Sequence, residues 1–340
     1  MKSVAKALAH ILAVGFALGL LLAGSPVGSA SPTPAPEPGP EQVTVGVYVQ
    51  NVQAVDLTTN SFSADFYVWL RWRNPDLDAP AGIEVQNVFE NWALSKTDVY
   101  PEPRKQPDGS LVWLGRYQGN FNAPLSVSDY PFQNQTLRFV FEDAINNVSN
   151  VVYVPDKNPI AVNPDITLAG YNFETPRILF DSHTYPTSFG DIESGPDDRT
   201  YTRVVVELPV TSPVTSGIFK TILPLLIVLI AAALGVIIPA EYVDSKVNVP
   251  ITALIALVAM QFGVSSALPE VGYLPMIDLI YVLAYAAITA MVGSAVIGAW
   301  RLRRDGEDAA MSLERRFTLW ISVAFVACFV AAVLFYTVHA

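Results

Sequence analysis

The stretch DSKVNVPITALIALVAMQFGVSSALP, residues Asp244–Pro269, decides the fold class of this chain. Its length suits a membrane-spanning helix, which needs ~20 predominantly apolar residues. It nevertheless contains polar side chains that a helix surrounded by lipid would avoid. Spacings of four and three residues, which follow one face of an α-helix, connect Asn248, Thr252, Ile255, Ala259, Phe262 and Ser266, and Asp244 precedes them.

These seven residues, the polar stripe, predict a helix that lines a pore. Amide and hydroxyl groups at Asn248 and Thr252 would solvate an ion, and a carboxylate at Asp244 would select its sign. Apolar side chains at Ile255 and Phe262 would form the gate by excluding water. The alternative is a helix buried among other membrane helices, with Asn248 and Thr252 bonding to its neighbours.

The composition of the chain favours a membrane protein over a soluble enzyme. Of 340 residues, 51% are hydrophobic and 15% are charged, whereas ~25% are charged in ordinary soluble proteins. A net charge of −11 argues against nucleic acid as a partner. One cysteine, Cys328, allows no intrachain disulfide. The three histidines have no second type of metal ligand beside them, so we expect no metal site, no cofactor and no enzyme.

The first residues resemble export and spacer sequences. Residues 1–30 predict a signal peptide, because Lys2 and Lys6 stand before an apolar run and small residues follow it at 28–30. A retained membrane anchor is the alternative. Residues 31–42 carry a proline at every second position, which predicts a stiff, extended linker.

Residues 43–212 predict an all-β, immunoglobulin-like sandwich outside the cytoplasm. Short runs of alternating apolar and polar residues are separated by clusters of turn residues, a pattern typical of strands. Residues 41–212 contain 22 Asp and Glu against 11 Lys and Arg. Such an acidic domain would concentrate cations near a membrane entrance. The alternative is that these acids serve only solubility.

Residues 213–339 predict a transmembrane domain of four helices, at about 216–239, 245–267, 274–300 and 317–338. The loop between the third and fourth segments contains the arginines at 301, 303, 304, 315 and 316, whereas residues 265–275 contain no Lys or Arg. Because basic loops stay in the cytoplasm, the β domain and the carboxyl end would lie outside. We therefore expect a multi-pass protein of the cell (inner) membrane.

One four-helix unit cannot enclose a wide aqueous path. The polar stripe therefore implies several copies around an axis, one such helix from each copy. No nucleophile elbow, phosphate-binding glycine loop or metal-ligand spacing occurs in the sequence.

Four short motifs, spread over the β region and the membrane segments, resemble motifs of the pentameric ligand-gated ion channels, or Cys-loop receptors. The resemblance is strongest to their prokaryotic branch. The resemblance covers about residues 43–339. Its motifs are Tyr130-Pro131-Phe132 followed by Gln135, Val68-Trp69-Leu70-Arg71 with Trp72, Leu223-Pro224, and Leu268-Pro269 followed by Ile277-Asp278.

The resemblance implies a homopentamer in the lipid bilayer with a central pore for permeant cations. It implies that Tyr130, Pro131 and Phe132, together with Pro269 and Asp278, couple the two domains. It also implies that Asp244 forms the selectivity ring at the cytoplasmic mouth, while the basic residue Lys246 points away from the pore. An interfacial carboxylate at Asp244 and a packing aromatic at Phe262 are the alternatives.

Four positions depart from the family pattern. Ala123 and Leu137 stand where animal members have the loop cysteines, as in bacterial members. Gln133 replaces the usual Asp of the loop, and Ser212 stands where an Arg usually precedes the first membrane helix. We therefore expect the coupling between domains to use other partners here.

The ligand site implied by the resemblance lies between subunits and is aromatic. By position, Trp69 and Trp113 would supply one side. Trp92, Tyr185 and Phe189 would supply the other. Such rings suit a small-molecule amine through cation–π attraction, although aromatics on strands more often belong to the core. Protons or divalent cations acting on the outer carboxylates are alternative modulators.

The leading hypothesis is a ligand-gated, cation-selective ion channel opened by a stimulus sensed in the outer domain. The alternatives are a membrane-tethered β-sandwich binding module without conduction and an anion-selective channel of the same fold. An enzyme acting on envelope material ranks last, since the sequence offers no catalytic constellation.

Overall fold

The computed structural model describes residues 39–190, 192, 195 and 197–339. The described residues from Pro40 onward belong to one compact unit. The predicted signal peptide, 1–30, and most of the predicted linker, 31–42, lie outside the described residues. The first strand begins at Glu41, inside the predicted linker boundary.

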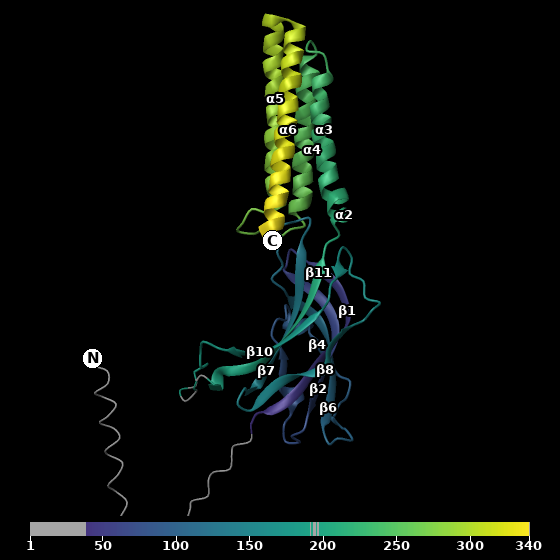
Figure 1. The fold of residues 1–340 in the computed structure, drawn as a ribbon, viewed down its shortest axis with the longest axis vertical. Helices are drawn as coiled ribbons and strands as arrows, with labels where there is room; N and C mark the ends of the chain where they lie inside the picture. The colour runs from purple at the N-terminus through teal and green to yellow at the C-terminus, as the bar shows by residue number, and fades with distance from the viewer. Residues whose placement is uncertain (1–38, 191, 193–194, 196, 340) are drawn as a thin grey trace, which may run out of the picture. The chain divides into compact units, whose positions relative to one another are not determined.

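The part of this unit that precedes the helices consists of two sheets (Figure 1). The first has the order β4-β6-β2-β1-β8, with β5 on β6. Its strands are β1 (Glu41–Asp56), β2 (Ser61–Trp72), β4 (Ser95–Asp98), β5 (Arg104–Lys105), β6 (Leu111–Asn122) and β8 (Val151–Val162). The second sheet, β10-β11-β7-β3 with β9 on β11, contains β3 (Ile83–Val85), β7 (Asn134–Asn147), β9 (Asn172–Phe173), β10 (Arg177–Thr184) and β11 (Thr200–Thr211).

Alternating side chains from both sheets form one core. In β11 every second residue is buried, including Val204, Val206 and Leu208, as expected for a strand with one covered face. Phe66 of β2 packs against Phe139 of β7, with ring centroids 4.3 Å apart. Three short helical turns lie between strands: α1 (Ala79–Gly82), η1 (Asn91–Ala93) and η2 (Asp197–Arg199).

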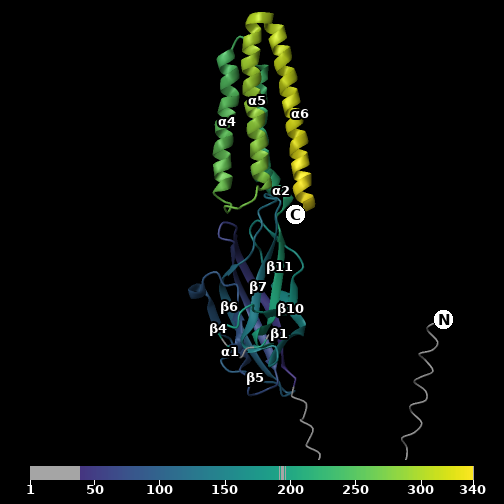
Figure 2. The ribbon, with the colours of Figure 1, turned by 90° about the vertical axis from the view of Figure 1, so that its left-hand side faces the viewer.

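Four helices long and apolar enough to cross a membrane follow the sheets (Figures 1 and 2). The first span is built from α2 (Val214–Gly217), the π-helical turn η3 (Ile218–Ile222), α3 (Leu223–Leu234) and the 3₁₀ turn η4 (Gly235–Ile237). The others are α4 (Val243–Ser265), α5 (Met276–Asp305) and α6 (Glu307–His339). The predicted fold class, a β domain followed by four apolar helices, is confirmed.

The expected loop over 301–316 is helical instead. α5 continues to Asp305 and α6 begins at Glu307, so Gly306 alone separates them. Arg, Glu and Ala are strong helix formers, and they extend both helices beyond the apolar segments. Gly306 adopts φ 86° and ψ 174°, a conformation that suits glycine because it has no Cβ. The arginines therefore lie on helix ends.

The sheets meet the helices through loops on both sides. The Met276 backbone N–H donates to the Ser128 carbonyl at 2.8 Å. The Val127 N–H donates to the Tyr273 hydroxyl at 3.2 Å. A Cβ on Gly217 of α2 would lie 2.9 Å from the Pro131 carbonyl oxygen. The loop before β7 is thus in close contact with both the first span and the start of α5.

Candidate functional site

The polar stripe occupies one exposed face of α4. Ile255 is 66% exposed and Phe262 is 73% exposed, although both are large and apolar. The same face exposes the remaining members of the stripe, Asp244, Asn248, Thr252, Ala259 and Ser266.

The opposite face of α4 is buried against α3 and α5. Ala253 and Leu257 belong to the apolar core of the helical domain, and Pro250 is buried beside them. Gln261, which lies off the stripe, accepts a hydrogen bond from the Tyr285 hydroxyl of α5 at 2.7 Å. Each chain therefore covers the apolar face of its own α4 and leaves the polar stripe uncovered.

Within one chain, the hydroxyl groups of the stripe form hydrogen bonds inside α4 and not with neighbouring helices, as the buried-helix alternative would require. The Thr252 hydroxyl donates to the Asn248 carbonyl of the same helix at 2.8 Å. The Ser266 hydroxyl donates to the Gly263 carbonyl, also in α4, at 3.0 Å. Asn248 and Thr252 border an open groove between α3 and α4.

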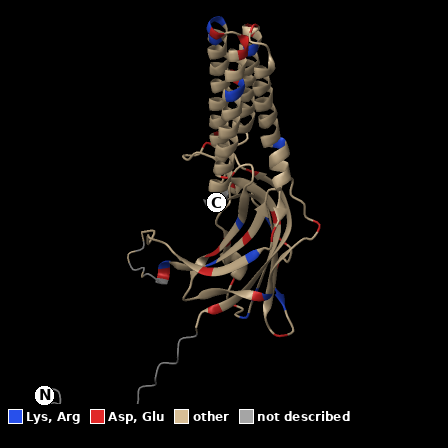
Figure 3. Cartoon of the chain, turned by 45° about the horizontal axis from the view of Figure 1, so that its top comes forward, with Lys and Arg blue, Asp and Glu red and all other residues tan. Residues whose placement is uncertain are grey.

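Charged residues are sparse along the helices (Figure 3). They gather mainly where α5 meets α6, at the end that holds the arginines. The carboxylate of Asp244 is exposed in the first turn of α4, where a helix N-terminus favours negative charge. The structure thus places one acidic residue at the start of the stripe and a long uncharged face beyond it.

The loop Tyr130–Phe132 lies between the sheets and the helices. The rings of Tyr130 and Phe132 pack against the apolar core of the helical domain, and Pro131 is buried. Pro269 is half-buried in the connection between α4 and α5, and Asp278 is half-buried in the first turn of α5. Tyr273 and Met276, which the sequence did not single out, supply the hydrogen bonds from this connection to the β domain.

Next to this loop, the carboxyl group of Asp129 is buried, with 7% of the residue exposed. Burial disfavours the charged form and raises the pKa of Asp129 above its usual range. A carboxyl group that protonates more readily than usual therefore lies at the contact between the two domains.

Two of the five candidate ligand-binding aromatics lie together in the loop that follows β10 of the second sheet. The rings of Tyr185 and Phe189 meet edge to face, with centroids 5.2 Å apart. The Tyr185 hydroxyl donates to Glu142 at 2.6 Å, and the Arg203 guanidinium donates to the same carboxylate at 2.8 Å. Burial and then Glu142 raise the pKa of Tyr185. Glu142 and Arg203 were not predicted, because strand periodicity does not reveal which buried charges will pair.

The three candidate tryptophans occupy different environments. Trp92 is 85% exposed. The Trp69 indole N–H donates to Asp156 of the same chain at 2.8 Å. Trp113 is 1% exposed, because its ring covers Gly115, where a Cβ would lie 2.1 Å from the indole. Trp113 is thus a core residue, and its assignment to a ligand site does not fit this position.

The comparisons with known proteins place these features in a family. No family model matches the chain. It is 23% identical over 264 residues to a proton-gated ion channel of Gloeobacter violaceus, covering 72% of this chain and 70% of that protein. It is 18% identical over 278 residues to the gamma-aminobutyric acid receptor subunit alpha-2 of Bos taurus, covering 75% of this chain and 59% of the relative.

A third relative is the neuronal acetylcholine receptor subunit alpha-9 of Gallus gallus, which is 23% identical over 190 residues, or 56% of this chain and 37% of the relative. The chain belongs to the pentameric ligand-gated ion channel superfamily. As such a channel-family member with four apolar helices, it is a multi-pass membrane protein.

The four positions that depart from the family pattern all carry uncharged residues. Ala123 and Leu137, at the places of the animal cysteines, are both buried in the core of the β domain. The Ser212 N–H donates to the Gln133 carbonyl at 3.1 Å, so the two positions that usually carry Arg and Asp still meet. The Gln133 side chain donates to the Tyr171 hydroxyl at 2.8 Å.

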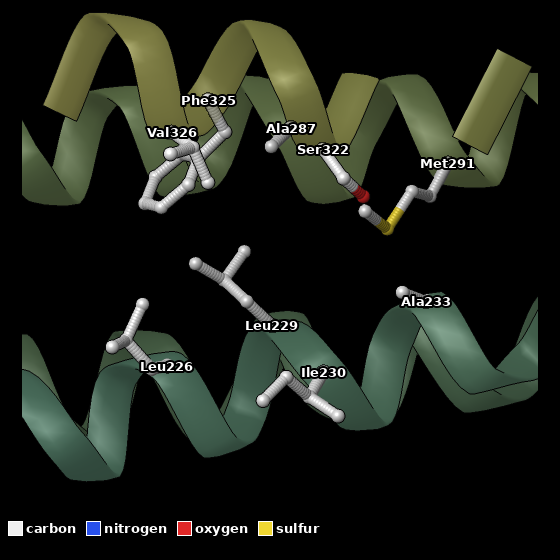
Figure 4. A pocket seen from close by; sticks show the side chains of 9 residues that line it. All are labelled: Leu226, Leu229, Ile230, Ala233, Ala287, Met291, Ser322, Phe325 and Val326. Carbon is white, nitrogen blue, oxygen red and sulfur yellow. The ribbon is translucent and has the colours of Figure 1, made fainter. Parts of the chain in front are cut away.

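A separate apolar pocket lies between α3 and the pair α5 and α6 (Figure 4). In Figure 4, side chains of α3, among them Leu229, lie across the pocket from Met291 and Phe325. Ser322 contributes the polar atom among the lining side chains drawn there. The pocket is on the side of the helical domain formed by α3, α5 and α6 and is not part of the polar stripe.

Proposed function

We propose that the chain forms a homopentameric, cation-selective channel in the membrane, with α4 of each copy lining the pore. One observation carries this proposal: the whole polar stripe is exposed, while the opposite face of α4 is buried within the same chain. Polar and ionisable groups within a membrane face a bundle interior or water, since lipid cannot solvate them. Copies of α4 around an axis supply that water-filled interior.

In this arrangement each part of the stripe has its own task. Five copies of Asp244 form a ring of carboxylates that attracts cations and repels anions. Asn248 and Thr252 line the hydrated inner section of the pore. Ile255 and Phe262 form apolar rings that close the path by dewetting when the pore narrows.

The β domain senses the stimulus, and the loop Tyr130–Phe132 transmits it. This loop contacts α2 through Gly217, and Ser128 just before it accepts a hydrogen bond from Met276 of α5. A displacement of the second sheet therefore reaches both helices that flank α4. Pro269, in the connection between α4 and α5, and Asp278, in the first turn of α5, complete the coupling path.

The stimulus belongs to one of three chemical classes. Tyr185, Phe189 and the exposed Trp92, on one side of a site between subunits, would bind an amine through their ring faces. Two observations favour protons as the stimulus. The carboxyl group of Asp129 is buried at the domain contact, and one relative is a proton-gated ion channel. Divalent cations would act by bridging the acidic side chains of the β domain.

The test is conduction by purified protein in liposomes. The wild-type protein is screened against amines, acidic pH and calcium, and its reversal potential is measured in asymmetric salt. We expect a stimulus-dependent current that reverses near the cation equilibrium potential. A reversal near the anion potential would make it an anion channel, and silence under every condition would favour a non-conducting tether.

The selectivity role of Asp244 is tested by Asp244→Lys. A ring of ammonium groups in place of carboxylates repels cations, so the reversal potential should move toward that of the anion. Glu307→Lys is the matched control, because Glu307 is an exposed acid in the first turn of α6 and lies off the stripe. Equal shifts in both variants would contradict the assignment.

A further inference from the structure

A buried ion pair joins α4 to α6. The Lys246 ammonium group donates to Oε2 of Glu314, and the two side chains are 3% and 2% exposed. Charges this deeply buried are costly unless they are paired. The sequence resemblance implied that Lys246 points away from the pore, but it gave no partner for the side chain.

The third helix, α5, is shaped to let this pair form. α4 and α6 each pack on α5, so their side chains must pass it to meet. Gly298 of α5 provides the passage, since a Cβ at that position would lie 1.6 Å from Oε1 of Glu314. Ser294 and Thr318 line the small enclosed space around the pair.

The backbone of α4 is interrupted at the same place. Pro250 lies four residues after Lys246, and proline has no N–H to donate to the Lys246 carbonyl. The first two turns of α4, which carry Asp244 and Asn248, are therefore less firmly joined to the rest of the helix. The Lys246 side chain instead ties them to α6.

We infer that the Lys246–Glu314 pair sets the rotation of the first turns of α4 and thereby aims Asp244 at the pore. This inference rests on the proposed function. Asp244 and Lys246 are two residues apart, or about 200° around a helix, so burying the ammonium directs the carboxylate to the uncovered face. Lys246 and Glu314 are thus positioning residues for ion selection, located behind the pore wall.

Removal of the Glu314 charge releases Lys246. An unpaired ammonium group is disfavoured in the buried site, so it would turn toward water beside Asp244. Glu314→Gln should then move the reversal potential away from the cation value, without any change to the stripe itself. Glu307→Gln on the same helix is the control and should leave the reversal potential unchanged. A wild-type reversal potential in Glu314→Gln would overturn the inference.

A double variant separates pairing from simple loss of structure. Lys246→Glu combined with Glu314→Lys restores a buried pair with reversed charges, and we expect it to recover cation selectivity relative to Glu314→Gln. Gly298→Ala should reproduce the selectivity loss, because its Cβ blocks the passage. Gly293→Ala, in the same helix with nothing within 4 Å of the added Cβ, should behave as wild type. If the double variant were no more cation-selective than Glu314→Gln, and if Gly298→Ala behaved like Gly293→Ala, the pairing role would be refuted.

A labelling experiment tests the inference without conduction. Cys328 is the single cysteine, so Cys328→Ala gives a background for Asp244→Cys and for Ser266→Cys at the far end of the stripe. Glu314→Gln should change the rate of maleimide labelling several-fold at 244 and leave it unchanged at 266. Equal changes at both sites would reduce the pair to a structural role. If wild-type protein does not conduct, the proposed function fails, and the labelling still decides on the pair.

Discussion

At the scale of single residues, the exposure of Ile255 and Phe262 calls for an explanation. Both are large, apolar and mostly exposed, although apolar side chains of this size usually lie in a core. On a helix that crosses a membrane, such exposure fits either lipid contact or a pore gate. Their place on the same face as Asp244, Asn248 and Thr252 favours the gate, because a lipid-facing surface would lack those polar neighbours.

Ile255→Ser should weaken the gate. A hydroxyl in the apolar ring favours water in the constriction, so we expect current at a lower stimulus or in its absence, with unchanged reversal potential. Val258→Ser, in the same helix and 38% exposed but off the stripe, is the control. Stimulus–response curves from reconstituted protein provide the measurement. An unchanged curve for Ile255→Ser would argue against a gate at this position.

Asp129 predicts a dependence of stability on pH. Burial raises its pKa, so the folded state binds the proton more tightly than the unfolded state does. The stabilisation is complete below the ordinary Asp pKa of about 3.9 and is lost as the pH rises through the elevated value. Asp129→Asn should therefore raise the melting temperature near neutral pH and flatten its pH profile.

Thermal unfolding across the acidic to neutral range measures this effect. Asp165→Asn is the control, because Asp165 is exposed in a loop of the same domain. If Asp129→Asn lowers the melting temperature near neutral pH, the charged carboxylate stabilises the junction and the assigned direction is wrong.

At the scale of elements, close backbone contact joins the β domain to the first span. Gly217 of α2 packs against the loop before β7. A Cβ added at Gly217 would lie 3.1 Å from the Phe132 ring. The π-helical turn η3 follows at once, and such turns often occur at functional sites. The first span therefore begins with an element that can respond to displacement of the loop.

Gly217→Ala should impair coupling and leave selectivity intact. The added methyl group meets a backbone carbonyl, which cannot move aside as a flexible side chain would, so the loop and α2 must separate. We expect a higher stimulus for half-maximal current and an unchanged reversal potential. Gly263→Ala in α4, where nothing lies within 4 Å of the added Cβ, is the control. A wild-type response in Gly217→Ala would exclude this contact from gating.

At the scale of the whole molecule, the single chain leaves surfaces that need partners. The polar stripe of α4 cannot face lipid at low cost, and Trp92 projects from the β domain almost fully exposed. Exposed aromatic side chains are common at the centre of protein interfaces. Both features fit a ring of identical subunits.

Native mass spectrometry of the detergent-solubilised protein measures the number of subunits. We expect a mass corresponding to five chains, because membership of the superfamily and the uncovered stripe both call for copies around an axis. Cross-linking at low protein concentration controls for association induced by detergent. A stable monomer would contradict the pore and favour a tethered binding module.

Much of the fold could be predicted from the sequence because it depends on local periodicity. Alternation along β11 and the apolar length of the four spans are properties of neighbouring residues, and the polar stripe follows from helical spacing alone. The full extent of α5 and α6 could not be predicted. The charge of the arginine-rich segment suggested a loop, whereas its residues also have high helix propensity. Packing of the two helices on each other favoured the helix.

The candidate site divides in the same way. The sequence by itself determined which residues of α4 share a face, because that depends only on 3.6 residues per turn. Only the tertiary structure decided that this face is uncovered, that Trp113 is buried while Phe189 is 71% exposed, and that Lys246 reaches Glu314 past Gly298. Burial and charge pairing depend on residues far apart in the chain, so they are fixed only when the helices and sheets pack together.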